Sequence, residues 1–168
     1  MSFPDDLLGD GLYKLGYTTN DLDWAIEHFQ SSLGFEGFMR FAPAPRVRRA
    51  DGRSGQAHLR CAFSTGRDRV VELMQPVDGL VDLWAEGLSA ADGPIVRFHH
   101  IGVVVDDLES VKQRAAALGM QPVQQSSVPG VLSVAYFDLP LLGHHVELVQ
   151  YDAGVGGVLR DARRTGRT

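Results

Sequence analysis

The stretch FHHIGVVVDDLESVKQRAAALGM, residues 98–120, decides the fold, because an altered copy of it, LYKLGYTTNDLDWAIEHFQSSLGF, occupies residues 12–35. Both copies contain an apolar run with a glycine, then Asp-Leu and an acidic residue, an amphipathic stretch and Leu-Gly. Alignment of the Asp-Leu pairs places Gly16 on Gly102. Each copy is followed by a second shared segment, RVVELMQ at 69–75 and HVELVQ at 145–150. The chain is therefore predicted to contain two halves with the same order of parts.

The spacing of apolar residues predicts the elements of each half. Alternation over 98–105 is typical of a strand, and the apolar residues from Leu108 to Leu118 recur every three to four positions, as in a helix. Asp106 or Asp107 can cap this helix, and Gly119 can end it. The first half repeats the pattern, with Asn20 or Asp21 as the cap and Gly34 at the end. Two extended runs follow the second helix, at 131–138 and 144–150, and PLLG between them is typical of a hairpin loop.

These elements predict an α+β fold, in which two tandem βαβββ modules form a cupped mixed sheet. We expect the first module at residues 1–77, a linker with a short helix at 78–94, the second module at 95–151 and a flexible tail at 152–168. Residues 41–56 contain Pro, Gly and Arg without a period, which predicts an enlarged loop in the first half only. Its arginines could bind a carboxylate or a phosphate-bearing carrier such as coenzyme A, although a solvated loop is the more common meaning: Arg46, Arg48, Arg49 and Arg53.

Composition excludes several classes of protein. The chain has 168 residues, of which 44% are hydrophobic and 22% charged, and this is typical of a globular protein. Its net charge of −5 argues against a nucleic-acid binder. Cys61 is the only cysteine, so no intramolecular disulfide can form and a reducing, cytoplasmic location is expected. No window is apolar enough to predict a membrane span.

Four polar residues occupy matching positions in the two halves: Lys14 and His100 in the first strands, and Glu72 and Glu147 in the last strands. A lone glutamate in a strand usually faces solvent, but two in matched Val-Glu-Leu contexts favour a shared site. Alternation places both on the face opposite the one that the helices cover. His100 shares its face with Gly102, whereas His99 falls on the other face with Ile101, Val103 and Val105. We therefore expect a polar site on the open, glycine-bearing face.

The motifs HHIGVVVDDLE, YFDLPLLG and VELVQ, with their degraded copies in the first half, resemble the vicinal oxygen chelate superfamily over residues 12–151. This superfamily includes glyoxalase I, methylmalonyl-CoA epimerase, extradiol dioxygenases and bleomycin-resistance proteins. The resemblance implies paired βαβββ modules that form a cupped sheet and bind one divalent metal through their first and last strands. The matching positions here are Lys14, Glu72, His100 and Glu147. It also implies a homodimer.

Lys14 departs from the family pattern, which generally places His, Gln or Glu at this position. An ammonium group has no lone pair to give a metal. Two alternatives follow: either His100, Glu72 and Glu147 hold the metal with open positions for substrate, or Lys14 pairs with Glu72 and replaces the charge of the metal. We favour the metal, because one imidazole and two carboxylates are competent ligands for a divalent ion such as Zn, Co, Ni, Mn or Mg.

The same residues bear on the reaction. One His and two Glu differ from the two His and one carboxylate of iron oxygenases, so a dioxygenase is disfavoured. The set fits proton abstraction next to the carbonyl of a small carboxylate or thioester, as in an isomerase, an epimerase or a glyoxalase-type lyase. The predicted catalytic residues are Glu72, Glu147 and Lys14, with His145, on the face of Glu147, as a candidate for substrate contact or proton transfer. The alternative is a metal-free binding protein that sequesters a ligand, which would need an apolar cleft and no reactive carboxylate.

Overall fold

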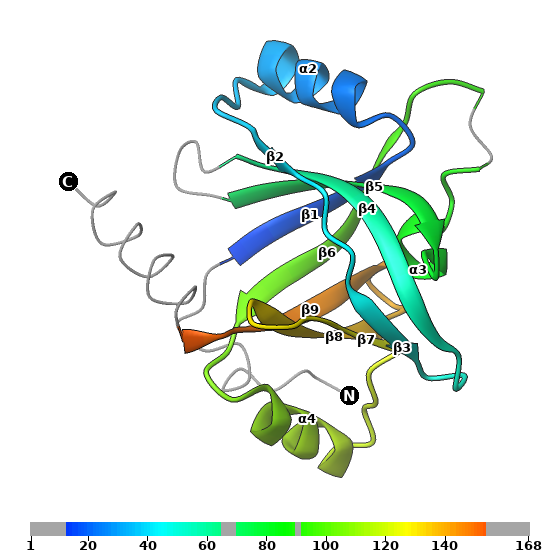
Figure 1. The fold of residues 1–168 in the computed structure, drawn as a ribbon, viewed down its shortest axis with the longest axis vertical. Helices are drawn as coiled ribbons and strands as arrows, with labels where there is room; N and C mark the ends of the chain where they lie inside the picture. Colours follow the sequence, from blue (N-terminus) through cyan, green and yellow to red (C-terminus); the bar gives the residue numbers. More distant parts are fainter. Residues whose placement is uncertain (1–12, 65–69, 90–91, 154–168) are drawn as a thin grey trace.

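The strands of the computed structural model, which describes residues 13–64, 70–89 and 92–153, form one mixed sheet that curls into a barrel-like cup (Figure 1). The first half contains β1 (Tyr13–Thr19), α2 (Leu22–Leu33), β2 (Met39–Phe41), β3 (Arg46–Arg49), β4 (Ser54–Ser64) and β5 (Val70–Gly79). A short helix, α3 (Asp82–Ala85), follows. The second half contains β6 (Val96–Val104), α4 (Leu108–Ala117), β7 (Gln124–Val128), β8 (Leu132–Leu139) and β9 (His144–Tyr151).

The strand order explains the closure of the cup. The described strands follow the order β2-β4-β3-β7-β8-β9-β6-β1-β5, and β4 also pairs with β5, so the sheet closes on itself. In each half the first strand pairs in parallel with the last, β1 with β5 and β6 with β9. The two first strands pair with each other in antiparallel orientation. The prediction of a cupped mixed sheet is confirmed.

Both long helices begin and pack as their sequences predict. The Asp21 side chain accepts a hydrogen bond from the backbone N–H of Trp24, and Asp107 accepts one from Ser110, so both predicted caps are confirmed. Gly34 ends α2 with a φ of 68°, in the left-handed region that favours glycine. The two helices lie at opposite ends of the view in Figure 1, each against the outside of the sheet. Their buried residues pack on outward side chains of the last strands: Leu22, Ala25, Ile26 and Phe29 with Val71 and Leu73, and Leu108, Val111 and Ala115 with Val146 and Leu148.

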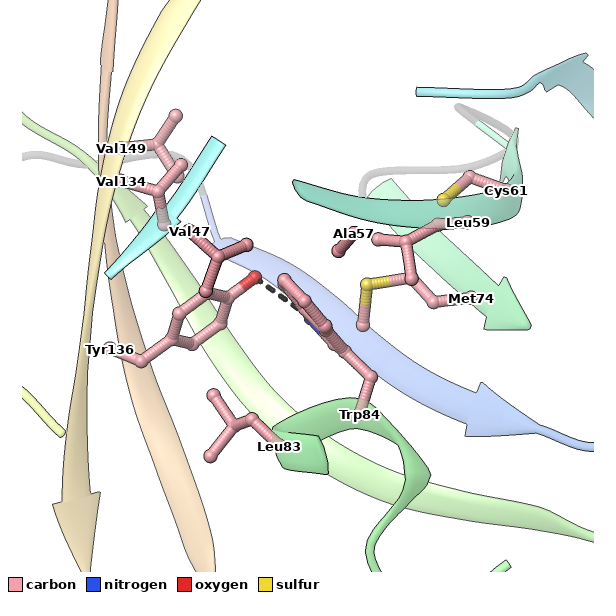
Figure 2. Close-up of a cluster of buried hydrophobic side chains, with 10 residues drawn as sticks. All are labelled: Val47, Ala57, Leu59, Cys61, Met74, Leu83, Trp84, Val134, Tyr136 and Val149. Carbon is pink, nitrogen blue, oxygen red and sulfur yellow. Dashed lines mark hydrogen bonds between the residues drawn. The ribbon is translucent and has the colours of Figure 1, made fainter. Parts of the chain in front are cut away.

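The inside of the cup holds a separate apolar cluster (Figure 2). Strands of both halves contribute to it, and α3 contributes Leu83 and Trp84, which are 4% and 1% exposed. Met74 and Val149, two residues after Glu72 and Glu147, belong to this cluster, so the predicted alternation of the last strands is correct. Helix α3 therefore fills part of the interior with a large aromatic side chain.

The prediction of an enlarged loop at 41–56 is wrong. This segment contains β3, which pairs with β7, and the start of β4. Val47 is 3% exposed and packs inside the cup, while Arg46 and Arg48 are exposed. The sequence does not identify β3 as a strand, because a single apolar residue among arginines is too short a pattern of alternating apolar and polar residues. The strand nevertheless joins the two halves of the sheet. The rest of the predicted tail beyond residue 153 lies outside the described residues. No described helix has the length and apolarity that crossing a membrane requires.

Candidate active site

Strand register brings the four matched polar residues together inside the cup. Lys14 on β1 lies opposite Gly102 on β6, and Gly102 pairs in turn with Glu147 on β9. His100 on β6 lies opposite Gly16 on β1, and Gly16 pairs with Glu72 on β5. Each half thus places a polar side chain over the glycine of the other half.

The two glycines are needed because the polar side chains fill the space above them. A Cβ atom on Gly16 would lie 1.9 Å from Cε1 of His100. A Cβ on Gly102 would lie 2.8 Å from Cε of Lys14 and 3.0 Å from Oε2 of Glu147. Carbon atoms in contact are normally about 3.5–4.0 Å apart. These two positions therefore admit only glycine unless the site rearranges.

Lys14 bridges the two carboxylates. Its Nζ lies 2.6 Å from Oε2 of Glu72 and 2.6 Å from Oε2 of Glu147. Nε2 of His100 lies 3.5 Å and 3.3 Å from the same two oxygens. All four side chains are buried. Three of their buried polar atoms make no hydrogen bond of ordinary geometry: Oε2 of Glu72, Oε2 of Glu147 and Nε2 of His100. Lys14 therefore contacts Glu72, as one of the two alternatives from the sequence expects, and it contacts Glu147 as well.

Electrostatics favour the charged forms of Lys14, Glu147 and His100. Burial by itself would lower the pKa of Lys14, but Glu147 and Glu72 outweigh it and raise that pKa. Burial would raise the pKa of Glu147, but Lys14 and His100 outweigh it and lower that pKa. Burial opposes the charged form of His100 as well, and Glu147 and Glu72 reverse the effect and raise its pKa. The buried charges are compensated mainly by one another.

Tyr136 on β8 supports Glu147, and sequence analysis missed it. Its hydroxyl donates a hydrogen bond of 2.6 Å to Oε1 of Glu147 and accepts one of 3.4 Å from Nε1 of Trp84, drawn as the dashed line in Figure 2. Both oxygens of Glu147 therefore have partners, whereas the described contacts of Glu72 involve only Oε2. Tyr136 lies directly opposite Glu147 on the neighbouring strand. Pairing of the two predicted hairpin strands would have identified it.

The expected position of His99 is wrong, because β6 contains an irregularity there. Gly16 pairs with His100 and the next residue, Tyr17, pairs with Phe98, so His99 is the extra residue. Its ring turns toward His100, with 2.9 Å between the two Nδ1 atoms, and its Nε2 lies 3.1 Å from the carbonyl oxygen of Leu83. When His99 donates to Leu83, its Nδ1 accepts from His100. The Nε2 of His100 then faces the two carboxylates.

The structure places His145 beside the four-residue cluster. Its ring lies 4.9 Å from the ring of His99, and its Nδ1 lies 3.5 Å from Oδ1 of Asp138. Burial lowers its pKa, although Asp138 opposes the shift. The described contacts thus connect His145 to His99 and, through His99, to His100, so two imidazole rings lie between His145 and the carboxylates.

The spacing of these atoms bears on whether a divalent ion fits among them. The ligand atoms of Glu72, His100 and Glu147 lie within 4.8 Å of one another, which suits a shared ion. Such an ion binds carboxylate oxygen at about 2.0–2.2 Å. Lys14 Nζ already lies 2.6 Å from both oxygens, carries a like charge and has no lone pair to donate. The three ligands alone fit an ion, but together with the Lys14 ammonium they do not.

The structure also has a cavity of about 420 Å³ that is separate from the four-residue cluster. It lies between α4 and the strands where the two halves meet, and its lining includes Arg46, Arg48, Lys112 and Ser127. None of the four clustered residues lines it. The predicted site and this cavity are therefore different places.

Comparisons with known proteins agree with the fold. Residues 13–136 match the model of the glyoxalase/bleomycin resistance protein/dioxygenase superfamily. No curated protein gives a significant match. Solved structures with a similar fold include a methylmalonyl-CoA epimerase from Mycobacterium tuberculosis, with 20% identity, a TM-score of 0.61 and coverage of 89% of this chain and 93% of the other.

Two further structures show the range of activities on this fold. A methylmalonyl-CoA epimerase in complex with methylmalonyl-CoA and NH4+ has 16% identity, a TM-score of 0.51 and coverage of 85% of this chain and 95% of the other. A mutant of 4-hydroxymandelate synthase from Streptomyces coelicolor has 14% identity, a TM-score of 0.50 and coverage of 84% of this chain and 48% of the other. At these identities the likeness establishes the fold alone.

Proposed function

Because the chain belongs to the glyoxalase/bleomycin resistance protein/dioxygenase superfamily, we propose that it is an enzyme that abstracts a proton next to the carbonyl of a small carboxylate or thioester. The reaction class is that of an isomerase, an epimerase or a glyoxalase-type lyase. Solved structures of similar fold include epimerases of methylmalonyl-CoA, a thioester of this kind. The two halves correspond in this proposal to two βαβββ modules, 1–77 and 95–151.

One observation carries the proposal: two buried carboxylates share a cation inside the cup. Burial of Glu72 and Glu147 in an apolar interior is costly, and a merely structural role would be served as well by apolar side chains. Charged groups held together out of water are typical of sites that move protons. This proposal does not include the predicted divalent ion, because the Lys14 ammonium already lies against one oxygen of each carboxylate.

The contacts assign different roles to the two carboxylates. Glu147 is held through both oxygens, by Tyr136 and by Lys14, and therefore positions the cluster. Glu72 is held through Oε2 and is the better candidate for the base. It takes the proton from the carbon next to the carbonyl, the electrons of the broken C–H bond move to the carbonyl oxygen, and return of a proton to carbon gives the product. His145 is proposed to exchange protons at the edge of the site.

Substrate entry requires a movement, since the four side chains are buried. Helix α3 is our candidate, because Trp84 contacts Tyr136 and the Leu83 carbonyl contacts His99. Withdrawal of α3 would expose Tyr136 and His99 together, and these two residues contact Glu147 and His100. A site closed in this way excludes water during proton transfer.

Exchange of the α-proton tests the function. Incubation with methylmalonyl-CoA in D2O should introduce deuterium that mass spectrometry detects, and Glu72→Gln should abolish the exchange. Glu27→Gln, on the exposed face of α2, is the matched control and should retain it. Equal exchange in both variants would refute the role of Glu72. Loss of exchange in wild type and control, across carboxylates and thioesters alike, would favour ligand sequestration instead.

We also propose that the chain forms a homodimer in the cytoplasm. Strand β2 pairs only with β4 among the described strands and leaves an open edge, which commonly promotes pairing between chains. The only cysteine, Cys61, is buried and free, which fits a reducing compartment. Light scattering should give about twice the 18.3 kDa of one chain. A mass of one chain at micromolar concentration would contradict the dimer.

A further inference from the structure

The cation of this site is part of the chain. Lys14 Nζ lies 2.6 Å from one oxygen of each glutamate, and these two glutamates are the residues that could bind a metal ion together with His100. The two glutamates come from different halves, so one ammonium joins both halves of the cup.

The surroundings hold Lys14 in this position. Its side chain is 9% exposed, and the glutamate side chains are 8% and 4% exposed, so water does not weaken the attraction. Gly102 provides the space for its aliphatic part, since a Cβ there would lie 2.8 Å from Lys14 Cε. The ring of Phe63 lies 5.5 Å from Nζ and adds a favourable contact with a cation. Two carboxylate oxygens at 2.6 Å favour the charged ammonium form of this side chain.

We propose that the Lys14 ammonium is a built-in cation that stands in place of a divalent metal, so that the chain neither needs nor tightly binds one. An ammonium group has three N–H donors. Two can face the carboxylates, and the third is available for the carbonyl oxygen of a substrate. When Glu72 takes the proton from carbon, negative charge develops on that oxygen, and the ammonium stabilises it by a charge-assisted hydrogen bond. This catalytic part rests on the proposed function, whereas the metal-binding part does not.

Metal titration of the untagged chain tests the metal-binding part. The chain has two lysines, and Lys112 pairs with Glu109 on α4, so Lys112→Gln is the matched control for Lys14→Gln. Calorimetry with Co²⁺ should show weak binding to wild type and control and at least tenfold tighter binding to Lys14→Gln, which is about 1.4 kcal/mol. Lys14→His should also bind Co²⁺ more tightly than wild type, so the test does not depend on the correct folding of one variant alone. The visible spectrum of bound Co²⁺ should appear only in the two Lys14 variants.

The opposite results are equally clear. A stoichiometric metal in purified wild type, or equal Co²⁺ affinity in wild type and Lys14→Gln, would overturn the inference. Proton exchange measured with and without EDTA tests the catalytic part, and wild type should be unaffected by the chelator. Loss of exchange in EDTA would also overturn it. If wild type shows no exchange with any substrate, the proposed function fails, while the titration still decides whether Lys14 excludes the metal.

Discussion

Replacement of Gly16 by alanine is the sharpest test of how the two halves share one site. The new Cβ would lie 1.9 Å from Cε1 of His100, so the ring must move by roughly 1.5 Å or more to restore an ordinary contact. The ring has little room, because His100 is 0% exposed and faces Glu72 and Glu147 on one side and His99 on the other. Overpacking of this kind costs about 1–3 kcal/mol. Gly16→Ala should therefore lower the melting temperature by roughly 2–12 °C for a chain of this size.

Thermal unfolding followed by circular dichroism checks this value, with Gly55→Ala on β4 as the control. A Cβ on Gly55 would lie 3.6 Å from Cβ of Leu80, which is an ordinary contact, so this variant should melt within about 2 °C of wild type. Gly16→Ala should also lose proton exchange, because the displaced His100 ring disturbs both carboxylates. If Gly16→Ala melts like Gly55→Ala and keeps full exchange, the ring of His100 does not occupy the space above Gly16. The register argument for the site would then be refuted.

The remaining predictions concern the supports of the site and the helix caps. Tyr136→Phe leaves Oε1 of Glu147 without its donor and should cost about 1–3 kcal/mol in urea unfolding; an unchanged midpoint would contradict the 2.6 Å hydrogen bond. Trp84→Ala should cost about 3–5 kcal/mol, because it empties a large part of the interior cluster, and a loss below about 1 kcal/mol would show that α3 is not packed there. Asp21→Ala and Asp107→Ala should each lower the free energy of unfolding by about 1 kcal/mol through loss of a helix cap. Stability equal to wild type would show that the capping hydrogen bond does not stabilise the helix.

The outer layers of the fold could be predicted because local signals and packing agree there. The spacing of apolar residues in α2 and α4 identifies the faces that pack on the sheet, and Asp21 and Asp107 mark where the helices begin. The alternation in the last strands separates Glu72 from its apolar neighbours correctly, since Val71 and Leu73 do contact α2. Each of these features depends on residues close together in the sequence.

The parts that could not be predicted depend on pairing between distant segments. Strand β3 has one buried residue, Val47, and it is stabilised by β4 and β7 rather than by its own pattern. The irregularity at His99 is visible only once β1 and β6 are paired, and it turns both neighbouring histidines toward one interior. An alternation rule applied to β6 alone must assign one of them to the wrong face.

Lys14 shows how far a sequence repeat can define a site. The repeat places Lys14, Glu72, His100 and Glu147 in matching positions, but it does not say which carboxylate the ammonium contacts. Parallel pairing of β1 with β5 brings Glu72 near, and antiparallel pairing of β1 with β6 brings Glu147 near through Gly102. Contact with both carboxylates at 2.6 Å is therefore a consequence of the junction between the halves. A cation built into the chain at this junction can serve both halves, which is the role that a shared metal ion would otherwise fill.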